Sequence, residues 1–291
     1  MSFTNDIKSE LAAIAPKTTC CRRAFSTGLV FGSVCDADDK IVLKFPAGEC
    51  SQLCVKMLRE RFGKTPCFTK SIVKRGEEYD IFALESQSAF SVAKDPLSIE
   101  KNIKCGSCVT AFLRGVFVSL GTVNDPHSAA YHAEFVFQDP FCAKVVYDFL
   151  CKLDLVPRIT NRKNGKVGLY YKSSTNIEEL LMKLGATNAA FELMNCKIER
   201  TIRNEENRAT NCVARNISRS VEASRRQVED IESLVASGRI EALPYDLRIT
   251  AKLRLDNPEA SLSELAALHI PPISKSGLNH RLQKLSDESK K

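Results

Sequence analysis

The chain has 291 residues, of which 44% are hydrophobic and 26% are charged, a balance typical of globular proteins and long enough for two domains. A formal net charge of +7 is compatible with a polyanionic partner but does not require one. No stretch approaches the roughly 20 apolar residues of a membrane span. The N-terminal segment MSFTNDIKSELAAIAPK carries acids where a signal peptide would be continuously apolar, so we expect a cytoplasmic protein.

Two apolar segments of the chain resemble each other. The first is AFSTGLVFGSV, residues 24–34, and the second is AFLRGVFVSLG, residues 111–121. Aligned without gaps, Cys21, Ala24, Phe25 and Gly28 match Cys108, Ala111, Phe112 and Gly115. Their apolar spacing predicts two equivalent helices.

The similarity continues after each of these helices. Residues 43–63 and 134–154 both read as a strand, a polar break, a cysteine and an amphipathic helix. A pair of strands across a polar turn follows in each case, and Asn164-Gly165 is a strong hairpin signal because both central positions of such a turn need positive φ. Each half therefore reads helix, strands, helix, strands.

Small residues recur at helical spacing in the two equivalent helices. Gly28 and Gly32 are four positions apart, as are Gly115 and Ser119. Because such a stripe lets another backbone approach closely, we expect the two helices to pack on each other there. The alternative is two unrelated buried helices whose glycines are incidental.

Cysteine and histidine usage offers no obvious reactive centre. The twelve cysteines are spread through a long chain, so we expect them to be reduced. Cys105 and Cys108 form a CxxC with no second CxxC or paired histidines at zinc-ligand spacing. We interpret them as buried structural thiols, with a metal or redox site as the alternative, and predict no metal ligand and no cofactor.

A basic segment begins near Lys197 and is rich in Arg and Asn, with no Pro or Gly before Gly238. We expect a basic loop, which includes Arg200, Arg203 and Arg208, followed by one long helix with apolar residues at near-helical spacing from 213 to 235. These arginines could meet DNA phosphates, or the segment could be a solvated link between two domains.

The last seventy residues predict a helix-turn-helix. A first helix ends near Asn257-Pro258, and Ser261 with Glu264 has the spacing of a capping box before a short helix over 262–268. The segment HIPP breaks this helix, and SKSGLNHRLQKL begins the last one.

The last predicted helix has two different faces. Leu278, Leu282 and Leu285 fall on one face at helical spacing. The other face and its flanks carry the candidate DNA contacts, which are Lys275, Ser276, Asn279, His280, Arg281 and Lys284. No acid occurs from Pro271 to Leu285, Asn suits adenine, and Arg suits guanine or phosphate. A solvated basic face is the alternative.

The duplicated α+β unit resembles the LAGLIDADG homing endonucleases, and with the C-terminal motifs NPEASLSELA and PPISKSGLNHRL nearly the whole chain resembles the WhiA family of bacterial transcription regulators. The last region also resembles region 4 of sigma factors. The resemblance implies an α+β, pseudo-twofold domain of two α-β-β-α-β-β units over residues 1–198, with halves of about 1–100 and 101–198. A basic linker, 199–217, and an all-α helix-turn-helix domain, 218–291, follow.

A homing endonuclease places a metal-binding acid at the foot of each repeated helix. Those positions hold Ser33 and Leu120 here, so we predict no catalytic residue and no nuclease activity. Asp36, Asp38 and Asp125 lie nearby as possible displaced ligands, but their neighbours favour turns.

The resemblance implies a regulator of cell division, chromosome segregation or sporulation genes that binds double-stranded DNA and is associated with the nucleoid. It also implies a WhiB-like iron–sulfur protein as partner if the source is actinobacterial, and no small-molecule substrate. An active endonuclease, or a scaffold whose strand surface binds protein, are the alternatives.

Overall fold

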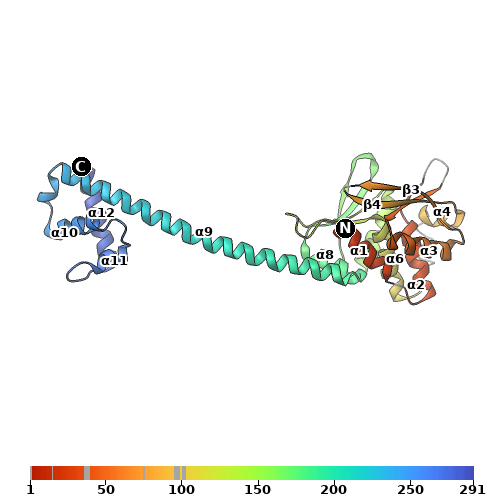
Figure 1. Ribbon diagram of the computed structural model, residues 1–291. Coiled ribbons are helices and arrows are strands. Elements are labelled where there is room, and N and C mark those ends of the chain that lie inside the picture. The colour runs from red at the N-terminus through yellow and green to blue at the C-terminus, as the bar shows by residue number, and fades with distance from the viewer. Residues whose placement is uncertain (1, 15, 36–39, 75, 95–98, 100–102) are drawn as a thin grey trace. The chain divides into compact units, whose positions relative to one another are not determined.

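The computed structural model describes residues 2–14, 16–35, 40–74, 76–94, 99 and 103–291 (Figure 1). The chain divides into two compact units, Met1–Arg200 and Thr201–Lys291. Helix α9, Thr187–Ala236, begins in the first unit and ends in the second. Within the described ranges, no helix is both long and apolar enough to cross a membrane.

The first unit contains two halves with the same order of elements. After α1, Phe3–Ala13, the first half runs α2 Thr19–Val30, β1 Val34–Cys35, β2 Ile41–Pro46, α3 Glu49–Phe62, β3 Cys67–Lys74, β4 Glu77–Leu84 and α4 Gln87–Lys94. The second runs α6 Gly106–Leu120, β5 Gly121–Val123, β6 Ala133–Phe137, α7 Pro140–Cys151, β7 Arg158–Asn161, η1 Lys163–Gly165, β8 Val167–Tyr171 and α8 Ser174–Leu184. The predicted helix, strands, helix, strands order is confirmed in both halves.

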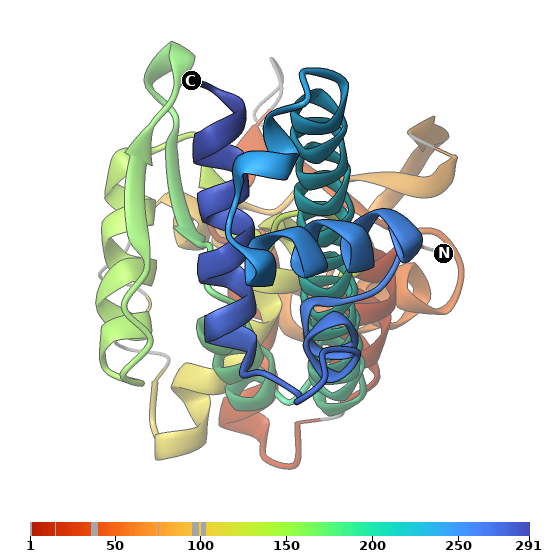
Figure 2. The same ribbon diagram turned by 90° about the vertical axis from the view of Figure 1, so that its left-hand side faces the viewer.

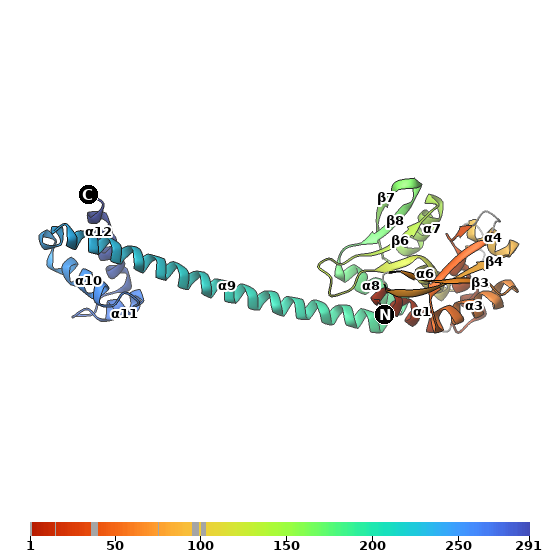
Figure 3. The same ribbon diagram turned by 45° about the horizontal axis from the view of Figure 1, so that its top comes forward.

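Each half builds one antiparallel sheet. The strand orders are β1-β2-β4-β3 and β5-β6-β8-β7, so corresponding strands occupy corresponding places. Figure 3 labels β3 and β4 of the first sheet and β6, β7 and β8 of the second. Leu43 pairs with Phe82 in one sheet and Phe135 with Leu169 in the other, and all four side chains are buried. Alternate residues therefore face the helices, which is the pattern of a sheet covered on one side.

The predicted hairpin turn between β7 and β8 is confirmed. Asn164 has φ 63° and Gly165 has φ 72°, so both residues occupy the left-handed region. Arg162 N donates to Lys166 O across the turn at 2.8 Å. Asparagine and glycine are the two residues that adopt this conformation at least cost.

Helices α2 and α6 pack on each other at their glycines, as the sequence predicts. A Cβ atom on Gly28 would lie 2.1 Å from Phe112 O, and a Cβ on Gly115 would lie 2.2 Å from Phe25 O. Two backbones are therefore in contact where any side chain would intervene. The predicted small-residue stripe is shorter than expected, because Gly32 lies beyond the end of α2, has φ +73°, and faces the side chain of Phe137.

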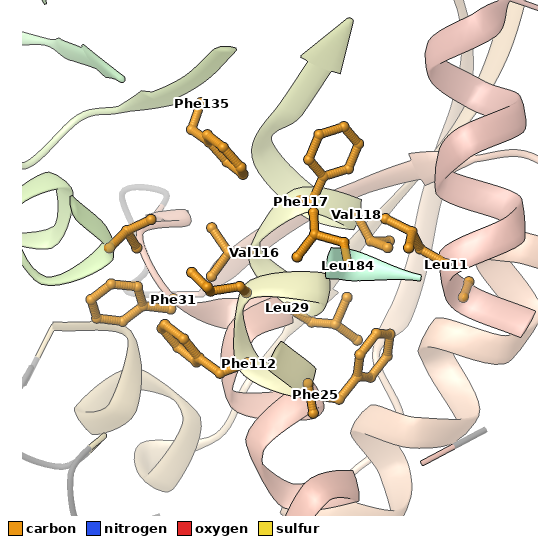
Figure 4. Packing of buried hydrophobic residues seen from close by; sticks show 14 of the residues in the cluster. Leu11, Phe25, Leu29, Phe31, Phe112, Val116, Phe117, Val118, Phe135 and Leu184 are labelled. Atoms are coloured by element: carbon orange, nitrogen blue, oxygen red, sulfur yellow. The ribbon is translucent and has the colours of Figure 1, made fainter. Parts of the chain in front are cut away.

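Large apolar side chains surround this crossing (Figure 4). Phe31 and Phe112 contact edge to face with ring centroids 5.4 Å apart, and Phe117 meets Phe135 of the second sheet at 5.5 Å. All four rings are fully buried. The two halves consequently share one core rather than two separate ones.

The second unit is helical. It contains the C-terminal part of α9, then η2 Arg239–Ala242, α10 Tyr245–Asp256, α11 Leu262–Ala267 and α12 Lys275–Ser289. Helix α12 packs against both α10 and α11, and Figure 2 shows these helices in the foreground in shades of blue. Leucines and alanines from α10, α11 and α12 form a core with Ile231 and Leu234 of α9.

The basic segment differs from the expected loop. Arg203 and Arg208 lie within α9, which is continuous from residue 187 to 236. The physical reason is composition, since this stretch contains no Pro or Gly and many good helix formers. The apolar spacing of 213–235 predicts a helix, and the structure extends this helix toward the N-terminus as far as Thr187.

Candidate nucleic-acid interface

The start of α11 is fixed by the predicted capping box. Glu264 N donates to Ser261 Oγ at 3.3 Å, and Ser261 N donates to Glu264 Oε2 at 2.8 Å. The backbone N–H of Ser261 stabilises the carboxylate and lowers the pKa of Glu264. Both orphan amides are satisfied, so the short helix starts at one defined residue.

The connection between α10 and α11 is held by a residue that sequence reasoning missed. Arg254 is 2% exposed, and its Nη1 donates to Ala260 O at 2.8 Å. Its Nη1 also donates to the carbonyls of Asn257 and Pro258, each at 3.4 Å. The buried guanidinium thus donates to the carbonyl oxygens of this turn. No local sequence signal identifies Arg254 in this role.

Helix α12 is anchored by the predicted leucine face. Leu278, Leu282 and Leu285 are 0%, 2% and 1% exposed and belong to the core of the second unit. Ser274 caps the helix, since Gly277 N donates to Ser274 Oγ at 3.1 Å. Burial of three leucines contributes several kcal/mol, roughly 2 kcal/mol for each, and fixes which face points outward.

The outward face of α12 is polar and carries most of the predicted contacts. Lys275, Ser276, Asn279, His280 and Lys284 are all exposed. Lys275 and Ser276 lie in the first turn of α12, where the backbone N–H groups have no hydrogen-bond partner within the helix. The face can therefore offer an amide for a base edge and cations and backbone amides for phosphates.

Arg281 lies differently from its neighbours on α12. Its Nε is 3.6 Å from Asp246 Oδ2 of α10, and only 28% of its side chain is exposed. It also lies close enough to the buried His269 to lower the pKa of that imidazole, after the larger effect of burial. Arg281 is thus engaged within the unit, whereas Lys284 is exposed.

The arginines of the basic segment divide into two kinds. Arg203 and Arg208 are exposed on α9 and available to an external partner. Arg200 instead donates through Nη2 to Pro126 O at 3.1 Å and to Ser128 O at 2.6 Å, and its guanidinium lies 4.7 Å from the Tyr131 ring centroid. Arg200 therefore fixes a loop of the first unit.

At the far end of α2 and α6, a cavity of about 510 Å³ opens between the two sheets. Ser33 follows α2, with Ser33 Oγ donating to Leu29 O at 3.4 Å, and Leu120 ends α6. The cavity is lined by residues of both sheets. Its charged lining residues are three lysines and three acids, Lys8, Lys44, Lys74, Glu77, Asp125 and Glu134, and Tyr79, Leu120 and His132 also line it.

Lys8 is the unexpected residue of this cavity. It comes from α1, is 6% exposed, and its Nζ lies 3.5 Å from Ser119 O. Burial lowers the pKa of Lys8 to about 8. A cation consequently lies beside the C-terminal end of α6, next to the position where a homing endonuclease carries one of its paired acids. The sequence does not indicate this burial, because a single lysine in an N-terminal helix is usually exposed.

Of the three candidate displaced ligands, Asp125 lies in the described part of the chain and fits the turn interpretation. Asp125 Oδ1 accepts from His127 N at 2.7 Å, which is the hydrogen bond of an Asx turn, so the predicted turn role is confirmed for this residue. Asp36 and Asp38, the other candidate displaced ligands, lie outside the described residues.

At the opposite end of the same helices, four cysteines meet. Cys20 and Cys21 open α2, while Cys105 and Cys108 open α6, and the four sulfur atoms all lie within 4.8 Å of one another. The expected burial holds for Cys108, whereas Cys105 is exposed, and Cys20 and Cys21 lie beside this CxxC pair. The match of Cys21 with Cys108 in the repeat was the signal, because equivalent starts of two packed helices must be neighbours.

These features define a protein class: a duplicated LAGLIDADG-like domain followed by a DNA-binding type of helix-turn-helix domain. Residues 109–203 match the family model of the WhiA LAGLIDADG-like domain, and residues 207–288 match that of the WhiA C-terminal HTH domain. The chain is 33% identical over 312 aligned positions to the probable cell division protein WhiA of Syntrophomonas wolfei subsp. wolfei, covering 100% of this chain and 98% of that one. The chain belongs to the WhiA family.

Two further comparisons agree. The probable cell division protein WhiA of Carboxydothermus hydrogenoformans is 33% identical over 300 positions, which cover 98% of this chain and 96% of that one. The crystal structure of full-length DUF199/WhiA from Thermatoga maritima has a TM-score of 0.57 at 23% identity and covers 100% of this chain and 98% of that chain. This last likeness shows the fold.

Proposed function

We propose that the protein is a sequence-specific DNA-binding transcription regulator of cell division, chromosome segregation or sporulation genes that does not cut DNA. The observation that carries the proposal is the two-sided geometry of α12. Its three leucines are buried, and its opposite face presents exposed Lys275, Asn279 and Lys284 on a segment free of acids. The relatives' name, probable cell division protein, supports the choice of target genes.

The side chains of α12 divide by role. Asn279 and His280 lie on the exposed face and can reach base edges in a major groove, with Asn suited to bidentate contact with adenine. Lys275 and Ser276 lie in the first turn, where backbone amides favour a phosphate. Lys284 lies further along and fits a phosphate contact, which positions the helix without specifying sequence.

The first unit fits a second, sequence-independent DNA surface. In the face of the first sheet turned away from the helices, Lys44 and Lys70 both pair with Ile81 and so lie in one row. On the corresponding face of the second sheet, Arg158 and Glu134 flank Tyr170, and Glu134 is already neutralised by an ion pair with Arg162. In these two rows, three basic side chains accompany one acidic side chain.

Loss of nuclease chemistry is part of the proposal. The helix feet hold Ser33 and Leu120, and the buried ammonium of Lys8 would repel a divalent cation at the cavity between the sheets. DNA binding without cleavage agrees with these side chains. A DNA-bound protein works on the chromosome, so a nucleoid-associated location in the cytoplasm belongs to the same proposal.

The test is selection of DNA by the purified full-length protein, followed by sequencing of the retained fragments. We expect one shared motif, and we expect Asn279→Ala to lose it while the matched Asn216→Ala, exposed on α9, retains it. A protein truncated after Val213 should retain no motif. If the truncated protein selects the same motif, the first unit is the reader. If no motif emerges with the full chain, sequence-specific binding is wrong.

A further inference from the structure

The four cysteines at the start of α2 and α6 form a compact group from two segments far apart in the chain. Cys21 Sγ lies 3.5 Å from Cys105 Sγ and 3.9 Å from Cys108 Sγ. Cys105 Sγ lies 3.4 Å from Cys108 Sγ and 3.7 Å from Cys20 Sγ. No pair is at the roughly 2.05 Å of a disulfide, and all four thiols are free.

These distances match one specific ligand geometry. Four sulfurs held about 2.3 Å from a central zinc ion lie about 3.8 Å apart at the corners of a regular tetrahedron. The four sulfur–sulfur separations scatter around that value, between 3.4 and 3.9 Å. A multi-iron cluster distributes its cysteines over several metal atoms and needs a wider spacing than a group that all lies within 4.8 Å.

The surroundings also fit a group of metal ligands. Cys21 and Cys108 are buried at the edge of the core, whereas Cys20 is half-buried and Cys105 is exposed, so the group is reachable from solvent. The N-termini of both helices meet here with no acid in either first turn, and their dipoles and unpaired amides stabilise negative sulfur. Thr18 Oγ1 lies 3.2 Å from Cys20 Sγ and can donate to it.

We propose that Cys20, Cys21, Cys105 and Cys108 bind one Zn²⁺ ion as a closed tetrathiolate site. With four protein ligands the ion has no open position, so its role is structural and not catalytic. It ties together the first turns of the two helices that cross at Gly28 and Gly115, at the end opposite to the cavity between the sheets. Arg22, Arg23 and Lys104 lie next to these cysteines in the sequence and supply positive charge near an ion with four thiolates.

The primary test is metal analysis of full-length protein, purified under reducing conditions without a metal-binding tag. We expect one zinc ion per chain by inductively coupled plasma mass spectrometry. Cys20→Ser and Cys105→Ser change the two more accessible ligands and should lose the zinc. Cys67→Ser and Cys212→Ser change exposed cysteines outside the group and should retain it.

A second measurement keeps the test decisive if a variant folds poorly. Wild-type protein stripped of metal and incubated with Co²⁺ should develop the visible bands of a tetrahedral tetrathiolate, and a chelator should lower its melting temperature. The proposal is overturned if correctly folded wild-type protein takes up no stoichiometric zinc after incubation with ZnCl₂. A disulfide among these cysteines in the purified protein, or iron in place of zinc, would equally contradict it.

Discussion

Gly28 and Gly115 occupy equivalent positions in two packed helices, and each faces the carbonyl oxygen of the residue three positions before the other. The Cβ atom that Gly28 lacks would lie 2.1 Å from Phe112 O, and that of Gly115 would lie 2.2 Å from Phe25 O. The relationship is reciprocal because Phe25 and Phe112 are themselves equivalent. Both glycines therefore lie beside the pseudo-twofold axis that relates the two halves.

The first prediction follows from this contact. Gly115→Leu should lower the free energy of unfolding of the full chain by about 3 kcal/mol or more, because the obstacle is backbone and cannot rotate away. Gly106→Ala in the same helix is the control, since a Cβ there meets nothing within 4 Å, and it should be neutral or stabilising by up to about 1 kcal/mol. Urea unfolding followed by circular dichroism measures both. Equal stability of the two variants would show that the helices can separate without cost.

A second prediction concerns base reading by α12. Asn279→Ala should weaken binding to the selected site by about 1 to 3 kcal/mol and leave binding to random DNA nearly unchanged, because a base contact distinguishes sequences and a phosphate contact does not. Competition binding with specific and random duplexes measures the difference. A uniform loss on both duplexes would place Asn279 on the phosphates instead.

The third prediction separates two cations of the same helix. Lys284 is exposed, whereas Arg281 is engaged with Asp246 of α10. Lys284→Ala should therefore lower the magnitude of the log–log salt slope of DNA binding by about one unit. Arg281→Ala should change that slope less and should reduce the stability of the second unit, by no more than about 1 kcal/mol for a partly exposed pair. Lys290→Ala, at the residue that follows the last turn of α12, is the lysine control. Equal slope changes for Arg281 and Lys284 would mean that DNA releases Arg281 from Asp246.

A fourth prediction concerns chemistry at the helix feet. Supercoiled plasmid incubated with pure protein and Mg²⁺ or Mn²⁺ should remain uncut, because Ser33 and Leu120 supply no carboxylate at the helix ends and the buried ammonium of Lys8 opposes a cation. Cleavage that disappears in the Asp125→Ala variant would indicate that Asp125 is a metal ligand, and its interpretation as a turn residue would be wrong.

The fifth prediction uses the pH dependence of Lys8. Burial lowers the pKa of this side chain from 10.5 to about 8, so between those values the unfolded chain binds the proton more readily than the folded one. The Lys8 contribution to stability consequently rises as the pH increases from about 8 toward 10.5. At pH 7 the buried ammonium is a full cost, and Lys8→Met should stabilise the protein by as much as about 3 kcal/mol.

Urea unfolding at pH 7 and at pH 9.5, with reductant present, measures this effect. The advantage of Lys8→Met over wild type should shrink at the higher pH, and Lys17→Met, at an exposed lysine, should show no such change. A Lys8→Met protein that is less stable at pH 7 would indicate that a bound anion stabilises the ammonium in the wild-type cavity.

Local signals were sufficient for much of the fold. The repeated order of helices and strands, the Asn164-Gly165 turn, the Ser261 and Glu264 capping box and the buried leucine face of α12 were all predicted from residues within a few positions of one another. Hydrophobic periodicity, positive-φ preference and side-chain capping act over that range, so the sequence by itself determines them.

Other features depended on which distant segments meet, and only the tertiary structure decided them. The cysteine group forms because the first turns of α2 and α6 lie side by side. Lys8 is buried because α1 packs against the C-terminal end of α6. Arg281 is partly covered because its side chain lies beside Asp246 of α10. Each outcome depends on the register and angle at which elements pack. Periodicity within one element carries no information about that register, because it identifies the buried face but not the side chains that it meets.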